Sequence, residues 1–358
     1  MTAGFHQLRI ADVRREIDDA VSLRFEVPEE ARDAFRFTPG QHLTLRTEIE
    51  GEELRRNYSI CVAPHEDELR VAIKQIAGGR FSNWANANLQ PGHTLDVMPP
   101  HGSFTWAFSP DARATYAGFA GGSGITPILS LMKTALATEP MSEFVLLYGN
   151  RGSNSIMFLE ELAALKNRFM DRLQIYHFLE DEEEEVDLFN GRLDSGKVAE
   201  LLGSLVDPAK IDAAFICGPG PMMDAVEAGL RQAGVPADRI LIERFTTGAP
   251  SAAQAAAMRA REQEAAGRKV RVTLEGRSRL VTFDAEAGNI LDSARAAGLP
   301  APYACKAGVC ATCRARLVRG KVAMAINYGL SDAEVAAGYI LTCQAVPETD
   351  DVAVDYDA

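Results

Sequence analysis

The sequence has no run of about eighteen apolar residues, the length that a membrane-spanning helix needs, so we expect a soluble protein with no membrane partner. It also has no excess of basic residues, because 37 Lys and Arg stand against 50 Asp and Glu, a net charge of −13. Binding to nucleic-acid phosphates requires a basic surface, so we expect no nucleic-acid partner. The first ten residues lack the apolar segment of a secretion signal, which indicates a cytoplasmic protein.

Two motifs that would activate oxygen are also missing. None of the six histidines follows a glutamate by three positions, as in the Glu-x-x-His pairs of di-iron carboxylate sites. There is no Cys-x-His pair, which a Rieske centre would use. Any chemistry on oxygen that involves this chain must therefore take place on another polypeptide.

Four of the six cysteines have a characteristic spacing, C-x4-C-x2-C followed by a more distant fourth cysteine. This is the ligand spacing of plant-type ferredoxins, in which four thiolates hold a 2Fe-2S cluster. The intervening residues are mostly small, which leaves room for backbone N–H groups to point at the sulfurs. A structural zinc site and a disulfide framework stay open as alternatives. The predicted cluster ligands are Cys305, Cys310, Cys313 and Cys343.

Changes in periodicity divide the chain into several regions, so we expect a multidomain fold. Residues 1–110 contain alternating apolar and polar segments and predict an all-β barrel. Residues 111–246 alternate strands, glycine-rich turns and helices, which is typical of an α/β domain with a parallel sheet. The alanine-rich stretch 247–267 is predicted to be a linker that is partly helical. Residues 268–358 have an α+β pattern and contain the four predicted cluster ligands.

Two segments of the predicted barrel have the residue types that a phosphate-bearing aromatic cofactor needs. On a strand, Arg56-Asn57-Tyr58-Ser59 could place a cation at a phosphate, a ring against a flat heterocycle and a hydroxyl at a ring nitrogen. A surface strand with an unrelated aromatic would look the same. The turn Gly78-Gly79-Arg80-Phe81-Ser82 precedes a predicted helix and could offer backbone N–H groups to an anion.

The α/β region has three candidate nucleotide contacts. The turn Gly121-Gly122-Ser123-Gly124-Ile125-Thr126-Pro127 opens a helix and could bind a phosphate, or could simply be a tight connection. Arg151 follows the second strand, where it suits the 2′-phosphate of NADPH, or could face water. Cys217 precedes Gly218-Pro219 and is either a buried apolar side chain or part of a nicotinamide site.

One acidic tract, residues 180–185, receives no chemical role. Six consecutive carboxylates repel one another in any packed setting, so the tract is predicted to be a solvated loop.

Taken together, these motifs resemble those of the ferredoxin–NADP reductase superfamily, and in particular its members with a fused C-terminal plant-type ferredoxin. The resemblance covers nearly the whole chain and includes Pro39-Gly40-Gln41-His42, Ile216-Cys217-Gly218-Pro219 and Glu243-Arg244-Phe245. Within the superfamily, the chain is most similar to the reductase subunits of bacterial phenylacetyl-CoA epoxidases. The resemblance implies a β-barrel that binds FAD, an α/β domain that binds the nicotinamide nucleotide, and a β-grasp ferredoxin domain.

The resemblance also implies roles for particular residues. Four would act at the flavin and nicotinamide, namely Ser59, Cys217, Glu243 and Phe245. The residues implied to bind cofactors are Arg56, Asn57, Tyr58, Ser59, Ile73, Gly79, Arg80, Phe81 and Ser82 in the barrel, and Gly122, Gly124, Thr126, Pro127, Arg151, Ser155, Gly218 and Pro219 in the α/β domain.

Three cofactor motifs in one chain predict a path for electrons. A nicotinamide nucleotide gives up two electrons as hydride and an iron–sulfur cluster accepts one at a time, so a flavin is needed between them. We expect electrons to pass from NADPH, rather than NADH, to FAD, then to the 2Fe-2S cluster, and finally to the terminal oxygenase subunits of a multicomponent oxygenase. The resemblance implies a phenylacetyl-CoA epoxidase as that oxygenase. A Rieske aromatic-ring dioxygenase or another di-iron monooxygenase is an alternative acceptor. A redox-sensing interaction module without turnover is an alternative of another class.

Overall fold

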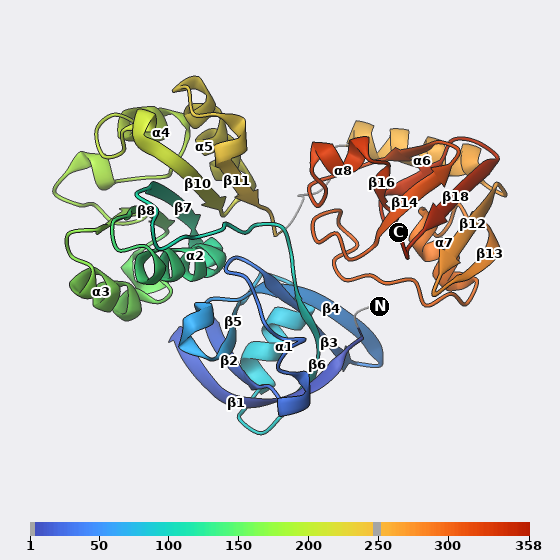
Figure 1. Ribbon diagram of the computed structural model, residues 1–358, viewed down its shortest axis with the longest axis horizontal. Helices are drawn as coiled ribbons and strands as arrows, with labels where there is room; N and C mark the ends of the chain where they lie inside the picture. The colour runs from blue at the N-terminus through green and yellow to red at the C-terminus, as the bar shows by residue number, and fades with distance from the viewer. Residues whose placement is uncertain (1–3, 246–251) are drawn as a thin grey trace. The chain divides into compact units, whose positions relative to one another are not determined.

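The computed structural model describes residues 4–245 and 252–358, which fall into two compact units. One unit comprises Phe5–Arg244 and the other begins at Phe245 and ends at Ala358. The helices and strands of each unit are labelled in Figure 1.

The first unit begins with a six-stranded antiparallel barrel. Its sheet order is β4-β3-β6-β1-β2-β5, and a bridge between Ile60 and Val71 brings the end of β4 to β5. Alternate side chains of each strand fill the barrel, as Val21, Leu23 and Phe25 do from β2. The strands are β1 (His6–Ile17), β2 (Ala20–Glu26), β3 (His42–Ile49), β4 (Glu52–Ser59), β5 (Leu69–Lys74) and β6 (Thr94–His101).

A single helix, α1 (Arg80–Asn88), lies across the barrel. It buries Phe81 and Ala85 in the barrel core, so the predicted helix after the glycine turn also closes the hydrophobic interior. The predicted β-barrel is therefore confirmed, together with the helix expected after its glycine turn.

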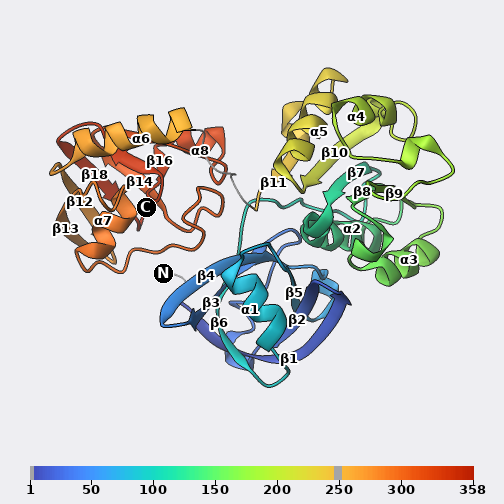
Figure 2. The same ribbon diagram turned by 180° about the vertical axis from the view of Figure 1, so that it is seen from behind.

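A five-stranded parallel sheet follows in the order β11-β10-β7-β8-β9, which confirms the predicted α/β fold. Both views place α2 and α3 on one face of this sheet and α4 and α5 on the other (Figures 1 and 2). The strands are β7 (Thr115–Gly121), β8 (Glu143–Asn150), β9 (Leu173–Leu179), β10 (Ile211–Cys217) and β11 (Ile240–Glu243), and the helices are α2 (Ile125–Thr138), α3 (Leu159–Arg168), α4 (Ser195–Leu201) and α5 (Gly220–Gln232).

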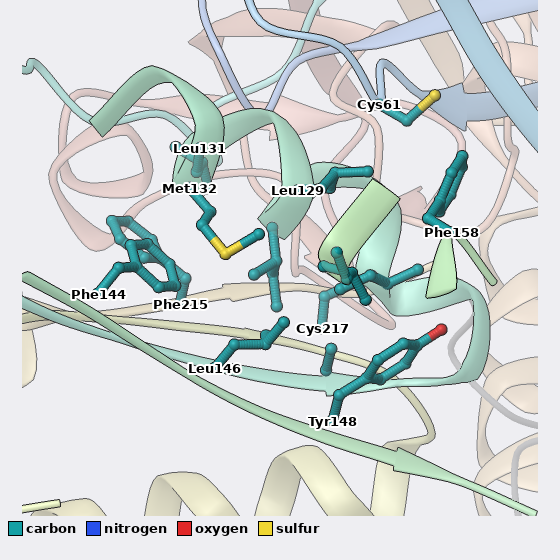
Figure 3. Packing of buried hydrophobic residues seen from close by; sticks show 14 of the residues in the cluster. Cys61, Leu129, Leu131, Met132, Phe144, Leu146, Tyr148, Phe158, Phe215 and Cys217 are labelled. Atoms are coloured by element: carbon teal, nitrogen blue, oxygen red, sulfur yellow. The ribbon is translucent and has the colours of Figure 1, made fainter. Parts of the chain in front are cut away.

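The core between the sheet and α2 is aromatic and aliphatic. Phe144 and Phe215 stack with ring centroids 6.2 Å apart, and Leu146 and Met132 lie beside them (Figure 3). Cys217 ends β10 at the border of this core, so the strand delivers its last side chain to the sheet edge where α/β proteins bind ligands.

Helix α2 also ties the α/β domain to the barrel. Its Ser130 hydroxyl donates to the carbonyl oxygen of Val62 at 2.6 Å. Its buried Lys133 bonds both carboxylate oxygens of Glu66 at 3.1 Å and pairs with Glu161 of α3. The ammonium group of Lys133 is therefore paired with one carboxylate of the barrel, Glu66, and one of the α/β domain, Glu161.

The second unit is built around a mixed five-stranded sheet in the order β13-β12-β18-β14-β16, with a separate β15-β17 pair. Strands β12 and β18 run parallel, and the other pairs are antiparallel. The strands are β12 (Lys269–Leu274), β13 (Arg277–Thr282), β14 (Arg314–Arg319), β15 (Val322–Met324), β16 (Tyr339–Leu341), β17 (Ala345–Pro347) and β18 (Asp351–Asp355), and the helices are α6 (Ala252–Ala265), α7 (Ile290–Ala296) and α8 (Asp332–Ala336).

The stretch predicted as a linker contains a helix. Residues 246–251 of this stretch lie outside the described residues, and residues from Ala252 onward form α6. Ala265, at the end of α6, is fully buried in the core of the second unit. In the described part of the chain, every helix is too short or too polar to span a bilayer.

Seven short 3-10 turns complete the secondary structure of the described residues. They are Glu29–Ala31, Pro64–Glu66, Gly122–Gly124, Ser153–Ser155, Asp187–Phe189, Pro208–Lys210 and Ala237–Arg239.

Candidate functional site

The four predicted cluster ligands lie together in the second unit. Three come from the loop between α7 and β14, and Cys343 follows β16. The side chains of Cys305 and Cys310 lie next to each other, as do those of Cys313 and Cys343, so the sulfurs form two pairs. All six cysteines of the chain are free thiols, which leaves the disulfide alternative without support.

Backbone N–H groups of the loop point at these sulfurs. The N–H of Ala307 donates to the sulfur of Cys305 at 3.3 Å, and the N–H of Cys305 lies 3.5 Å from the sulfur of Cys310. Gly308 has a φ of +74°, and a Cβ atom there would lie 3.0 Å from the carbonyl oxygen of Ile326. The small residues of the loop are therefore needed for its tight path around the sulfurs.

The thiol pairs fit a 2Fe-2S cluster, in which each of two irons takes two protein thiolates. Within residues 4–245 and 252–358, no three His, Cys, Asp or Glu side chains converge as ligands of a single metal ion would. The N–H groups around the sulfurs would stabilise the negative charge of such a cluster.

In the barrel, β4 presents the predicted flavin residues on both of its faces. Arg56 is exposed, and Tyr58 packs on Phe81 with ring centroids 5.7 Å apart. Burial raises the pKa of the Tyr58 hydroxyl, so the phenol is neutral at ordinary pH. Ser59 is buried at the end of the strand. This set offers a cation, a ring and a hydroxyl, which fits an aromatic cofactor with phosphates.

The turn before α1 is held together by Ser82. Its hydroxyl oxygen accepts from the N–H of Ile76 at 3.2 Å and lies 3.4 Å from the carbonyl oxygen of Gly79. Ser82 is 4% exposed, so its buried hydroxyl stabilises the turn. Arg80 begins α1, and its side chain pairs with Glu52.

Two further residues predicted at the cofactor are interior. Ile73 of β5 and Phe81 of α1 belong to the barrel core, with at most 1% exposure. Phe81 contacts Tyr58 of the predicted flavin site, and Ile73 lies in the same barrel core.

The turns after β7 and β10 press against each other at their glycines. A Cβ atom at Gly124 would lie 2.1 Å from the carbonyl oxygen of Cys217, and one at Gly218 would lie 2.9 Å from the nitrogen of Gly121. Gly122 has a φ of +51°, and a Cβ there would meet no heavy atom within 4 Å. The glycines therefore bring two stretches of main chain together beside open space, as a dinucleotide cradle requires.

Polar side chains surround this cradle. The Thr126 hydroxyl donates to the carbonyl oxygen of Ser123 at 3.0 Å, and the Tyr148 hydroxyl donates to that of Gly122 at 2.9 Å. Pro127 is buried in the first turn of α2, where it has no N–H to leave unpaired. Among the described residues, the buried Asn150 Nδ2 is one of few side-chain nitrogens without a hydrogen-bond partner, which is consistent with a ligand contact.

The loop after β8 carries Arg151 and Ser155. Arg151 is exposed, and the Ser155 hydroxyl donates to the carbonyl oxygen of Gly152 at 2.7 Å. The acidic tract reaches this loop, because Glu182 Oε1 accepts from the N–H of Ser153 at 2.6 Å and from its hydroxyl at 3.0 Å. No sequence motif indicates this contact, since it joins the ends of two neighbouring strands.

Two of the four residues expected to act in hydride transfer, Cys217 and Glu243, meet at the ends of β10 and β11. Cys217 and Glu243 are paired in register, and burial, followed by the charge of Glu243, raises the pKa of the Cys217 thiol well above its usual value. Nδ1 of His42 lies 3.8 Å from Oε1 of Glu243. Sequence reasoning missed His42 as a site residue, because its neighbours there come from distant strands.

Pro219 borders the glycine cradle, whereas Phe245 begins the second unit. Pro219 precedes α5, and its Cδ would lie 2.6 Å from a Cβ atom at Gly121, so it closes the cradle on one side. Phe245 directly follows the Glu243-Arg244 pair at the end of β11, and its side chain is 39% exposed.

Family models match the chain in the order that the motifs predict. Residues 7–106 match the oxidoreductase FAD-binding domain, residues 119–228 the oxidoreductase NAD-binding domain, and residues 272–348 the 2Fe-2S iron-sulfur cluster binding domain. A component of the 1,2-phenylacetyl-CoA epoxidase of Escherichia coli (strain K12) is 46% identical over 99% of this chain and 98% of its own length. The chain belongs to the ferredoxin–NADP reductase superfamily. It is a member with a C-terminal 2Fe-2S domain.

Other similar proteins include reductase components of other oxygenases. The ferredoxin reductase component of 3-ketosteroid-9-alpha-monooxygenase of Rhodococcus rhodochrous is 35% identical over 98% of this chain and 96% of its own. Phthalate dioxygenase reductase shares the fold, with a TM-score of 0.58 and 24% identity over 98% of both chains. An intact type IV self-sufficient cytochrome P450 monooxygenase also shares it, with a TM-score of 0.70 and 22% identity over 98% of this chain, which spans 41% of that longer one.

The domains define what this reductase does. It transfers electrons from NAD(P)H through FAD and a 2Fe-2S cluster. The geometry of the chain fits these groups, with two thiol pairs for the cluster, a glycine cradle for the nucleotide, and a cation, ring and hydroxyl for the flavin.

Proposed function

We propose that this reductase delivers electrons from NADPH to the terminal oxygenase of a phenylacetyl-CoA epoxidase. The observation that carries the proposal is the 46% identity with the Escherichia coli epoxidase component over nearly the whole of both chains. The electron path is common to related reductases, so the acceptor is what distinguishes them. In this proposal the oxygenase centre lies outside these 358 residues, because they contain neither the Glu-x-x-His nor the Cys-x-His motif of oxygen-activating centres.

In this proposal the barrel holds and orients the flavin. The exposed Arg56 would meet a phosphate, Tyr58 would pack on the ring system, and Ser59 would offer its hydroxyl to a ring nitrogen. The flavin, once bound, supplies the conversion between two-electron and one-electron transfer. Because Tyr58 is braced by Phe81, its ring can hold a flat partner in one orientation.

The α/β domain orients the nicotinamide nucleotide. The main chain of the glycine cradle would approach the pyrophosphate, and the buried, uncharged thiol of Cys217 would shape the nicotinamide site. The Glu243 carboxylate lies beside that thiol in register. As hydride leaves, the nicotinamide ring becomes positively charged, so an ionised carboxylate nearby stabilises the transition state.

The preference for NADPH rests on Arg151. Its exposed guanidinium follows β8, at the sheet edge where the ribose 2′ position is read. The neighbouring Ser155 would support the same phosphate, while Glu182 occupies the N–H and hydroxyl of Ser153 and would oppose it.

A charge reversal tests this preference. Arg151→Glu should weaken NADPH binding by about tenfold or more while changing NADH binding little, since a charge-assisted hydrogen bond contributes roughly 1.5–3 kcal/mol. Glu182→Gln is the matched variant and should strengthen NADPH binding. If Arg151→Glu weakens both nucleotides equally, Arg151 does not read the 2′-phosphate.

Reconstitution tests the partner. The purified chain with NADPH should support substrate oxidation by a purified phenylacetyl-CoA epoxidase, and a Cys310→Ser variant that retains FAD should not. The assignment is wrong if the chain fails with that epoxidase but supports a Rieske dioxygenase or the oxygenase of a 3-ketosteroid monooxygenase.

A further inference from the structure

A buried histidine faces the proposed nicotinamide site with one nitrogen unused. His42 of β3 is 4% exposed and is paired in register with Ser59 of β4. In the described part of the chain its Nδ1 has no hydrogen-bond partner, and this atom lies 3.8 Å from Oε1 of Glu243. Three strands from two domains thus place an unpaired nitrogen opposite a carboxylate that ends β11.

The hydrogen bonds behind the ring determine which nitrogen carries the proton. The Thr44 hydroxyl lies 2.9 Å from Oδ1 of Asn57 and 3.3 Å from Nε2 of His101, and it donates its one proton to the nearer acceptor, Asn57 Oδ1. This directs the Asn57 amide nitrogen at Nε2 of His42, 3.3 Å away. An amide nitrogen only donates, so Nε2 accepts. The proton of the neutral ring is therefore on Nδ1, the nitrogen that faces Glu243.

The surroundings keep this ring neutral. Burial holds the pKa of His42 well below its ordinary value, and His101 of β6, whose ring centroid is 4.2 Å away, lowers it further. The other titratable groups that face this point are Glu243 of β11 and the Cys217 thiol of β10, which remains protonated. His42 therefore meets the carboxylate as a neutral N–H donor.

We propose that His42 is a positioning residue for Glu243, to which it presents Nδ1–H so that the carboxylate stays oriented and ionised beside the nicotinamide. A carboxylate in a buried site gains protons more readily unless a donor stabilises its charge. At 3.8 Å the donor acts on that charge through its N–H dipole, and an approach of about 1 Å would form a full hydrogen bond. With both groups bound, the C–H bond of the nicotinamide would break with both electrons leaving as hydride to the flavin, and an ionised Glu243 would stabilise the cationic ring left behind.

The proposal rests on the role proposed for Glu243 but not on which oxygenase is the partner. It also explains Gly102, since a Cβ atom at that position would lie 2.8 Å from Nδ1 of His42. The absence of a side chain there lets the ring occupy its position.

Two conservative variants separate the two nitrogens of the ring. The amide of asparagine can take the place of Nδ1 and face Glu243, whereas the amide of glutamine reaches the place of Nε2 and faces Asn57. Infrared difference spectra of the FAD-loaded full chain would follow protonation of the Glu243 carboxyl, assigned by the band that Glu243→Gln removes. We expect His42→Gln and His42→Leu to raise the midpoint of this titration by about one pH unit, tenfold in proton affinity, and His42→Asn to leave it near the wild-type value.

The acidic limb of the rate of flavin reduction by NADPH should move by the same amount in the same variants. Equal midpoints in all variants, or a shift in His42→Asn and not in His42→Gln, would overturn the proposal. If His42→Leu loses FAD, the asparagine and glutamine pair still decides the matter, with FAD content as the measure of folding. If the midpoint of the Glu243 titration shifts while the pH profile of flavin reduction does not, His42 positions Glu243 but Glu243 has no role in hydride transfer.

Discussion

Replacing Gly124 by alanine should separate the two turns that form the nucleotide cradle. The new Cβ atom would lie 2.1 Å from the carbonyl oxygen of Cys217 and 2.4 Å from its carbonyl carbon. These are main-chain atoms, which cannot rotate away, so the turns must part by roughly 1 Å. Overpacking usually costs about 1–3 kcal/mol, and we expect a loss of about 3 kcal/mol because the obstacle is backbone.

The measurement is urea unfolding with Gly220→Ala as the control. Gly220 begins α5 beside the same turns, and a Cβ there meets nothing within 4 Å, so alanine should stabilise by about 0.5 kcal/mol. Fluorescence of Trp106, 6.1 Å from Phe215, reports on the α/β domain when Trp84→Phe removes the other tryptophan. Affinity for NADP⁺ should fall in Gly124→Ala alone. Equal stability and affinity in both variants would refute the close contact.

Three other perturbations follow from the site and the core. Cys310→Ser should abolish cytochrome c reduction and spare ferricyanide reduction through the flavin, and a joint loss with FAD retained would contradict transfer in series. Lys133→Met should lower the free energy of unfolding by roughly 2 kcal/mol, because it leaves partly buried carboxylates such as Glu66 unpaired. Lys133→Arg is the control and should cost less. A hydrogen bond from Arg70 lowers the pKa of Asp12, so its stabilisation is present above the unfolded pKa and is lost as pH falls through the folded one. Wild type and Asp12→Asn should therefore differ most in urea midpoint at about pH 7, and the difference should shrink as the pH falls below about 3.9 towards the lowered pKa of Asp12.

Local patterns were sufficient to predict much of the architecture. The cysteine spacing works because three ligands belong to one loop, whose small residues and N–H groups are read directly from the chain. The strands of the barrel were equally accessible, because β2 has a large apolar residue at every second position, Val21, Leu23 and Phe25. The strand, glycine turn and helix that include Gly124 form one continuous segment, so this half of the cradle could be predicted, but its contact with the turn after β10 could not.

Contacts between distant segments could not be predicted in this way. His42 meets Glu243 only because β3 and β11 come together, and 201 positions separate them. The same holds for Glu182, which looks like one of six solvated carboxylates until the ends of β8 and β9 bring it to Ser153. Ser82 shows a different limit, since its position in the turn was predicted but the direction of its hydroxyl depends on the local hydrogen bonds.

The shared cation at Lys133 has a consequence for protein engineering. Exchanging the barrel for that of a relative would also exchange Glu66, and a graft without a carboxylate at that place would leave the lysine with Glu161 alone. Chimeras joined between β6 and β7 should therefore be stable only when the donated barrel has a carboxylate at the position of Glu66. Domain shuffling should therefore keep Glu66 of the barrel, Lys133 of α2 and Glu161 of α3 together.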